Sequence, residues 1–135
     1  LGDSEQFRSA KRYPVTLHHH VLVLRVDENL FFANATQIEA RVVGRALRRK
    51  GTRDVVIACG SVNRIDSTGL HMLLRMSRTL ADAGIDFHLS EIKGPLIQTL
   101  GPANLAANIS GEIFFSNDEA LNALTNESPA EETAS

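Results

Sequence analysis

Hydrophobic and polar positions along this chain alternate between short apolar runs and longer amphipathic segments. The short runs, rich in Val, Ile, Leu and Phe, are typical of strands. They predict strands at 21–26, 29–33, 54–58, 85–90 and 112–115, with an extended edge segment at 13–17. The Asp27-Glu28 pair is predicted to be a tight turn, so that the first two of these strands form a hairpin.

Segments with helical spacing alternate with these strands. The first begins at Asn34, where Gln37 completes a capping box, and it ends at Gly51. Its predicted buried positions are Ala35, Ile38, Val42 and Ala46. The second spans 67–83, and its apolar stripe consists of Leu70, Leu73, Leu74, Ser77, Leu80 and Ala81. Two shorter helices are predicted at 94–100 and 120–124.

This order of elements predicts an α/β fold. We expect a single domain with a central, mostly parallel sheet, an N-terminal β-hairpin, and helices packed on the sheet through right-handed crossovers. A chain of 135 residues is long enough to bury one such core. The ends of the chain lack this periodicity. Residues 1–12 are predicted to be a linker and 126–135 a disordered acidic tail, which leaves 13–125 as the domain.

The composition is that of an ordinary globular protein, with 43% hydrophobic and 22% charged residues. No apolar run approaches the roughly 18 residues that a membrane-spanning helix needs. The single cysteine, Cys59, excludes an internal disulfide and is predicted to be a small buried side chain. The net charge is −2, aromatic residues are few and Trp is absent, so no nucleic-acid partner is predicted.

The most informative segment is the Asp66-Ser67-Thr68-Gly69 turn, which follows a predicted buried strand and opens a helix. Open parallel sheets bind ligands at the carboxyl ends of their strands. The free N–H groups and dipole of a helix N-terminus also favour negative charge. A hydroxyl here could accept a phosphoryl group or meet an anionic partner. The alternative is that Asp66 or Ser67 simply caps the helix, as such residues commonly do.

Catalytic and metal-binding motifs are not evident. The sequence has neither a Gly-x-x-x-x-Gly-Lys-[Ser/Thr] loop nor a Gly-x-Gly-x-x-Gly motif. Ser67 and His71 lie four residues apart, but no third group is placed to orient the imidazole. Residues 18–20 are consecutive histidines beside a strand, where neighbours point to opposite faces. His88 is predicted to be an interior or edge histidine. We therefore predict no enzyme activity, no cofactor and no metal.

The Asp66-Ser67-Thr68-Gly69-Leu70 turn and the order of elements resemble the STAS domain, named for sulfate transporters and anti-sigma-factor antagonists. The resemblance covers about 21–124. Stand-alone antagonists carry an Asp-Ser-[Ser/Ala/Thr]-Gly motif whose serine is phosphorylated by a partner kinase. By that match, Ser67 is the phosphoacceptor position and Asp66 is its neighbour.

Other segments are more similar to the cytoplasmic domains of SulP anion transporters. These are Leu24-Arg25-Val26-Asp27 with Leu30-Phe31-Phe32-Ala33-Asn34-Ala35, and the later segments 91–95, 113–114 and 119–121. The resemblance implies a non-catalytic regulatory and protein-interaction domain of an inner-membrane transporter of the sulfate or bicarbonate class. The alternative is a stand-alone anti-sigma-factor antagonist switched by serine phosphorylation.

The resemblance also implies partners and a location. The partners would be the transmembrane domain of the same chain, a cytoplasmic regulatory protein and a second copy of the domain, at the cytoplasmic face of the bacterial inner membrane. The regulatory turn would be 66–69. The surface beside it that we expect to contact a partner consists of Asn63, Arg64, His71 and Arg75.

Overall fold

The computed structural model describes residues 15–100, 105 and 107–134. The predicted linker at 1–12 lies outside them. A five-stranded sheet in the order β1-β2-β3-β4-β5 forms the centre of the domain. The strands are β1 (Val15–His18), β2 (Val21–Arg25), β3 (Asp54–Ala58), β4 (Asp86–Ser90) and β5 (Ile113–Phe114). β1 is antiparallel to β2 and every other pair is parallel, which confirms the predicted mostly parallel sheet.

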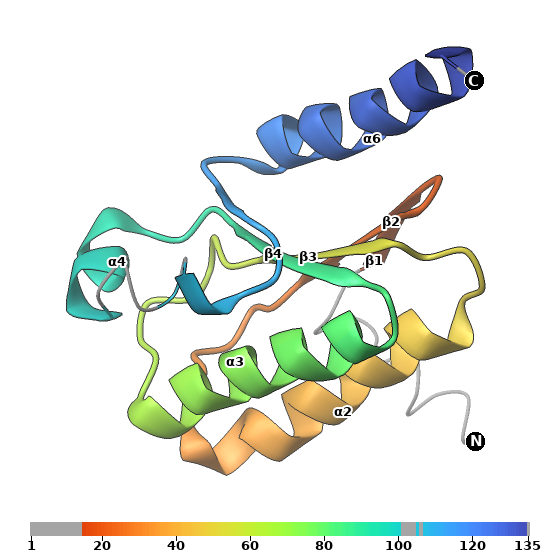
Figure 1. The fold of residues 1–135 in the computed structure, drawn as a ribbon. Coiled ribbons are helices and arrows are strands. Elements are labelled where there is room, and N and C mark those ends of the chain that lie inside the picture. The colour runs from red at the N-terminus through yellow and green to blue at the C-terminus, as the bar shows by residue number, and fades with distance from the viewer. Residues whose placement is uncertain (1–14, 101–104, 106, 135) are drawn as a thin grey trace, which may run out of the picture.

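Helices cover both faces of the sheet. They are α2 (Phe32–Arg48), α3 (Ser67–Asp82), α4 (Gly94–Leu100) and α6 (Asn117–Ala134). The strands follow one another in sequence order, so crossovers of one hand place their helices on the same face. α2 and α3 accordingly lie side by side below the sheet in Figure 1, whereas α6 lies alone above it.

Side chains alternate between these two faces along each strand. Leu22, Val55, Ile57, Phe87 and Leu89 belong to the large core under α2 and α3. A smaller apolar cluster lies between the sheet and α6. Its buried members are Val21, Val23, Val56, Ala58, Phe114, Ala120 and Leu124. The domain therefore has one extensive apolar core and one much thinner apolar contact.

The buried faces of the two long helices test the predicted stripes. In α2 the buried residues are the four predicted ones, Ala35, Ile38, Val42 and Ala46. In α3 they are Gly69, Met72, Leu73, Met76, Ser77 and Leu80. The predicted stripe of α3 was thus only partly right, because two methionines lie at its centre while Leu70 and Leu74 are half-buried and Ala81 is exposed.

The predicted strand at 29–33 is wrong, and so is the hairpin built on it. The observed hairpin joins β1 and β2 through a turn at 19–20, and α2 already begins at Phe32. Asn34 does not precede the helix but lies in its first turn, where its Oδ1 accepts the Phe31 N–H at 3.0 Å. Its Nδ2 donates to the Asn29 carbonyl at 2.8 Å. These local bonds favour a helix start over a strand.

The last helix also differs from its predicted bounds. α6 begins at Asn117, where the preceding Ser116 Oγ accepts the Glu119 N–H at 3.1 Å. It continues to Ala134, through residues that the composition predicts as a disordered tail. Ala and Glu, frequent in this stretch, have high helix propensity. The structure therefore corrects the predicted helix end at Leu124.

Candidate functional site

The Asp66–Gly69 turn lies where α3 begins, beside the start of α2. Asp66 is the N-cap of α3, and its Oδ1 accepts the Gly69 N–H at 2.8 Å. Its other oxygen, Oδ2, accepts the Phe32 N–H at 3.0 Å. Hydrogen bonds from the Phe32 N–H and, as the second contribution, from the Gly69 N–H hold the pKa of Asp66 below its ordinary value. One carboxylate therefore joins the first turns of both long helices, which confirms the capping interpretation for Asp66.

Backbone contacts hold the rest of the turn against Leu30. The Leu30 N–H donates to the Arg64 carbonyl at 3.0 Å, and the Leu30 carbonyl accepts the Asp66 N–H at 3.0 Å. Gly69 packs on the same carbonyl, since a Cβ at that position would lie 2.2 Å from the Leu30 oxygen. Asn29 Oδ1 accepts the N–H groups of Asn63 and Arg64 at 2.8 and 3.1 Å. These contacts therefore hold the turn rigidly in place.

Ser67 is the first residue of α3 and its side chain is exposed. Thr68 beside it is half-buried, while Asn63, Arg64 and His71 are exposed. The carboxyl edge of the sheet thus presents the Ser67 hydroxyl to solvent on a helix N-terminus, a place that tolerates negative charge. The structure brings the predicted regulatory turn together with Asn63 and Arg64 at this edge.

Two aromatic residues and two cations surround the turn. Phe32 is 77% exposed, and the Arg64 guanidinium lies 6.0 Å from the centroid of the Phe31 ring. Lys93 donates to Asn63 Oδ1 from the neighbouring loop. Both phenylalanines fall in the strand that the sequence predicts at 29–33, and this expectation hides the surface position of Phe32.

Arg75, which the sequence predicts as a contact residue, is already paired within the domain. Its Nε and Nη2 donate to the two carboxylate oxygens of Glu39 on α2, at 2.9 and 2.7 Å. This bond raises the pKa of Arg75, although the pair is exposed. Arg75 therefore links the outer surfaces of α2 and α3, at some distance from Ser67 along the helix.

Cys59 follows β3 and is buried, as predicted. Burial, with a smaller contribution from the charge of Glu91, raises the pKa of its thiol to about 12. A thiol with such a pKa carries almost no thiolate at neutral pH and is a poor nucleophile.

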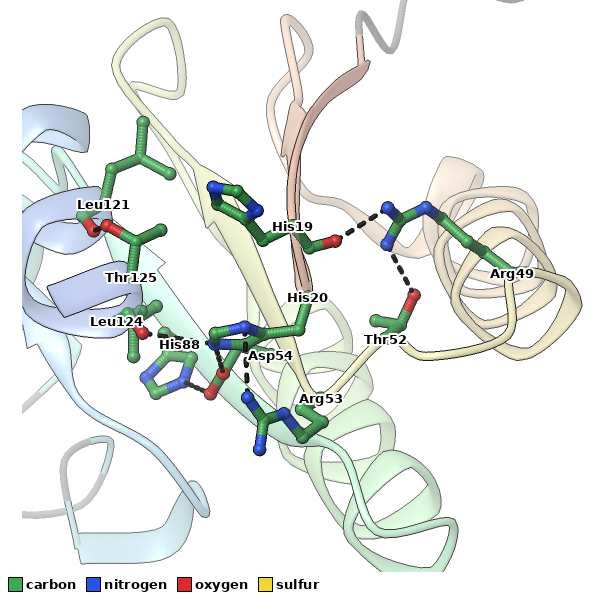
Figure 2. Close-up of polar contacts among 10 residues, drawn as sticks. All are labelled: His19, His20, Arg49, Thr52, Arg53, Asp54, His88, Leu121, Leu124 and Thr125. Atoms are coloured by element: carbon green, nitrogen blue, oxygen red, sulfur yellow. Dashed lines mark hydrogen bonds and ion pairs between the residues drawn. The ribbon is translucent and has the colours of Figure 1, made fainter. Parts of the chain in front are cut away.

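A second polar cluster lies at the opposite, amino end of the strands (Figure 2). His20 and His88 both contact the carboxylate of Asp54, at 3.3 and 2.9 Å. Asp54, Asp86 and His88 also place one ligand-type atom each within 4.8 Å of the others. However, His88 Nδ1 accepts the Glu112 N–H at 3.0 Å, so the neutral ring carries its hydrogen on Nε2. That nitrogen is occupied by a hydrogen bond rather than free for a metal.

Two of the five histidines of the chain, His20 and His88, belong to this cluster. His88 is an interior histidine with partners for both ring nitrogens, as predicted. The sequence predicts no shared site for the three consecutive histidines, because neighbouring side chains beside a strand point to opposite faces. His18 and His19 are exposed, but His20 turns inward at the β1–β2 turn. Only the pairing of β2 with β3, which sequence alone does not specify, brings it to Asp54.

Comparison with known proteins assigns the chain to a family. The STAS domain profile matches residues 12–120. The chain therefore belongs to the STAS domain family, which confirms the predicted resemblance. Sulfate transporter 2.1 of Arabidopsis thaliana is 27% identical over 136 residues, which cover 91% of this chain and 20% of that transporter. The chain spans about a fifth of the length of the curated relatives it matches.

Solved structures share the fold. The murine anion transporter Solute Carrier 26 family member A9 superposes with a TM-score of 0.69 at 16% identity, over 78% of this chain and 18% of that one. The phosphorylated form of the Bacillus cell fate determinant SpoIIAA gives a TM-score of 0.61 at 15% identity, over 83% of this chain and 98% of that one. Among the residues that the structure describes, no helix is long and apolar enough to span a membrane.

Proposed function

We propose that this chain is the cytoplasmic regulatory domain of a SulP-type anion transporter of the sulfate or bicarbonate class. The similarity to a plant sulfate transporter over 91% of the chain carries this proposal. In such a protein the transmembrane domain of the same chain is the first partner. A cytoplasmic regulatory protein and a second copy of the domain are further partners, at the cytoplasmic face of the inner membrane.

The domain acts through binding rather than catalysis. Ser67 is exposed on a helix N-terminus, and the residues around it cap helices, pair with one another or lie open to a partner. His71 lies four residues along the same helix, but no described carboxylate bonds to its ring to orient it. Esterase and phosphatase screens of the purified chain should give no turnover that is lost on Ser67→Ala. Turnover with that dependence would contradict the proposal.

The proposed regulatory element is the Asp66–Gly69 turn. A phosphate on Ser67 would add about −1.5 to −2 charges at pH 7. The helix dipole and free N–H groups tolerate this charge within the domain. A partner that packs on neutral Ser67 and exposed Phe32 would instead meet a charge that it must desolvate. Phosphorylation would therefore change binding far more than folding.

A stand-alone anti-sigma-factor antagonist is the second candidate function. The Asp-Ser-Thr-Gly turn supports it, together with the fold shared with SpoIIAA, which has been solved in a phosphorylated form. In this case the partners would be a kinase and an anti-sigma factor, and Ser67 would be the switch between them.

Fractionation of source cells separates the two candidates. An antibody against this domain should detect, if the transporter proposal is right, a membrane-fraction protein about five times as long as the chain, as the 20% coverage of the plant relative implies. Deletion of the domain should then reduce anion uptake. A soluble protein near 14.7 kDa would contradict the transporter proposal and favour the antagonist.

A further inference from the structure

His20, Asp54 and His88 form a cluster, here named the histidine clasp, on the sheet face that α6 covers. It lies at the amino ends of β3 and β4 and takes no part in the Ser67 turn. His88 is 3% exposed, and its Nε2 donates to Asp54 Oδ1 at 2.9 Å. His20 Nε2 lies 3.3 Å from Asp54 Oδ2 and 3.1 Å from the Leu124 carbonyl of α6. The clasp thus joins the β1–β2 turn, β3, β4 and α6.

Both rings are held in one protonation state by their neighbours. His88 Nδ1 accepts the Glu112 N–H, and His20 Nδ1 lies 3.2 Å from Arg53 Nη2, which can only donate. Each ring is therefore neutral, with its hydrogen on Nε2. The Leu124 carbonyl, which can only accept, requires the same arrangement of His20.

A second proton on either ring would have to occupy Nδ1. On His88 this N–H would face the Glu112 N–H, donor against donor. The space there is closed, because a Cβ on Gly111 would lie 2.3 Å from His88 Nδ1, so a water molecule has no room to accept the new hydrogen. On the half-buried His20 the new hydrogen would face the Arg53 guanidinium. For the buried His88, a donor without an acceptor is strongly unfavourable.

The charged groups around the clasp have opposite effects on protonation of its two rings. The carboxylates of Asp54 and Asp86 favour a proton on the rings, whereas Arg53 opposes it. From α6 the described contact to the clasp is the Leu124 carbonyl, which accepts from His20 Nε2 and carries no net charge (Figure 2). Protonation therefore strengthens the ring contacts to Asp54 but breaks the His88 contact to the Glu112 backbone. Protonation of His88 therefore weakens the attachment of the segment that begins at Glu112.

That segment contains the shortest strand of the sheet. Glu112 leads into β5, which pairs with β4 through only Ile113 and Phe114. The Phe114 ring packs 5.6 Å from the His88 ring and lies beneath α6. α6 buries only Ala120 and Leu124 on this face among its described side chains. Three backbone bonds also hold this segment: Gly111 N–H to the Phe87 carbonyl, Leu89 N–H to the Glu112 carbonyl and Glu91 N–H to the Phe114 carbonyl. Loss of the Glu112 N–H bond to His88 would therefore remove one of the few bonds of this short strand, and so loosen β5 and the α6 helix that packs on it.

We propose that the histidine clasp is a proton-sensitive latch for α6. With neutral rings it holds β5 and α6 on the sheet. Protonation of His20 and His88 releases them and uncovers the apolar surface formed by Val21, Val23 and Val56. The rest of the fold, with its large core under α2 and α3, stays intact.

The protonation states can be tested on the unmodified 135-residue chain by ¹⁵N NMR of the imidazoles. We expect both rings to be neutral with the hydrogen on Nε2 at about pH 7.5, where an unperturbed histidine is mostly neutral. A hydrogen on Nδ1 of either ring at that pH would overturn the proposal. So would coordination of added Zn²⁺ through His88 Nε2.

Amide hydrogen exchange then tests the release. Between about pH 7.5 and 5.5, we expect protection factors in 113–114 and 120–125 to fall by about tenfold more than those in α2. The double variant His20→Gln/His88→Gln should lose this pH dependence, whereas the exposed control His71→Gln should keep it. Equal protection at both pH values in the parent chain would overturn the proposal, even if the double variant failed to fold.

Discussion

At the carboxyl end of the sheet every bond that positions the Ser67 turn involves a backbone group, whereas at the amino end the histidine clasp is built from side chains. The turn is held by backbone bonds of Leu30 and by the Asp66 and Asn29 side chains, which accept backbone N–H groups, and Ser67 stays exposed. The clasp instead packs one buried and one half-buried ring around one carboxylate. A site fixed by the backbone can change its exposed side chain at little cost to the fold. A site made of buried polar side chains cannot.

The largest effect should come from the backbone contact under the turn. Gly69→Ala places a Cβ 2.2 Å from the Leu30 carbonyl oxygen, which belongs to the backbone and cannot rotate away. We expect a loss of about 3 kcal/mol in the free energy of unfolding, measured by urea denaturation. The control Gly94→Ala meets nothing within 4 Å and should stay within about 0.5 kcal/mol of the parent. Equal stability of the two variants would show that the turn is not rigid.

The next largest effect should come from the clasp. Asp54→Ala removes the acceptor shared by His20 and His88, so the buried His88 N–H loses its partner while His20 keeps the Leu124 carbonyl. We expect a loss of about 2 kcal/mol in unfolding free energy. Asp86→Ala, at the exposed neighbour in register with Asp54, should change it by about 0.5 kcal/mol or less. If the two substitutions cost the same, the clasp is not an integrated network.

A smaller effect is expected at Asp66. Because the folded state lowers the pKa of this carboxyl group, its contribution to stability is present above the unfolded pKa of about 3.9 and is lost as the pH falls through the lower folded pKa. Asp66→Ala should therefore be less stable than the parent at pH 7, and the difference should vanish in strong acid. Urea denaturation at a series of pH values checks this. A difference that persists unchanged to pH 2 would contradict the role of the carboxylate.

These contrasts also explain what the sequence could reveal. Apolar periodicity predicted β3, α3 and the buried face of α2, because burial dictates which side chains such elements carry. The strand at 29–33 was wrong because Phe31 and Phe32 are typical strand residues, yet the hydrogen bonds of Asn34 start a helix there. Local propensity does not report bonds of this kind.

The Ser67 turn and the histidine clasp also differ in how far the sequence alone could reveal them. The Ser67 turn could be found because its residues are consecutive and lie at a strand-to-helix junction. The clasp could not, because His20, Asp54 and His88 come from three separate segments that meet only through strand pairing. Phe32, an exposed aromatic residue near the turn, was likewise hidden by its assignment to a strand.

The smallest effect on stability should come from Ser67 itself. Ser67→Asp and Ser67→Ala should each stay within about 0.5 kcal/mol of the parent in unfolding free energy, since the side chain is exposed and the helix N-terminus accepts negative charge. A large destabilisation by Ser67→Asp would mean that the residue is a structural part of the helix start. The control is Thr79→Asp, which is exposed on the same helix about 18 Å further along.

Anion uptake by the intact transporter that carries this domain tests the central claim most directly. Three variants at equal membrane abundance are compared with the parent: Ser67→Asp, Ser67→Ala and Thr79→Asp. We predict that Ser67→Asp changes uptake several-fold, whereas Ser67→Ala and Thr79→Asp resemble the parent, because only a charge at the turn alters the partner contact. Identical uptake by all four proteins would contradict the account of the Asp66–Gly69 turn as a regulatory surface.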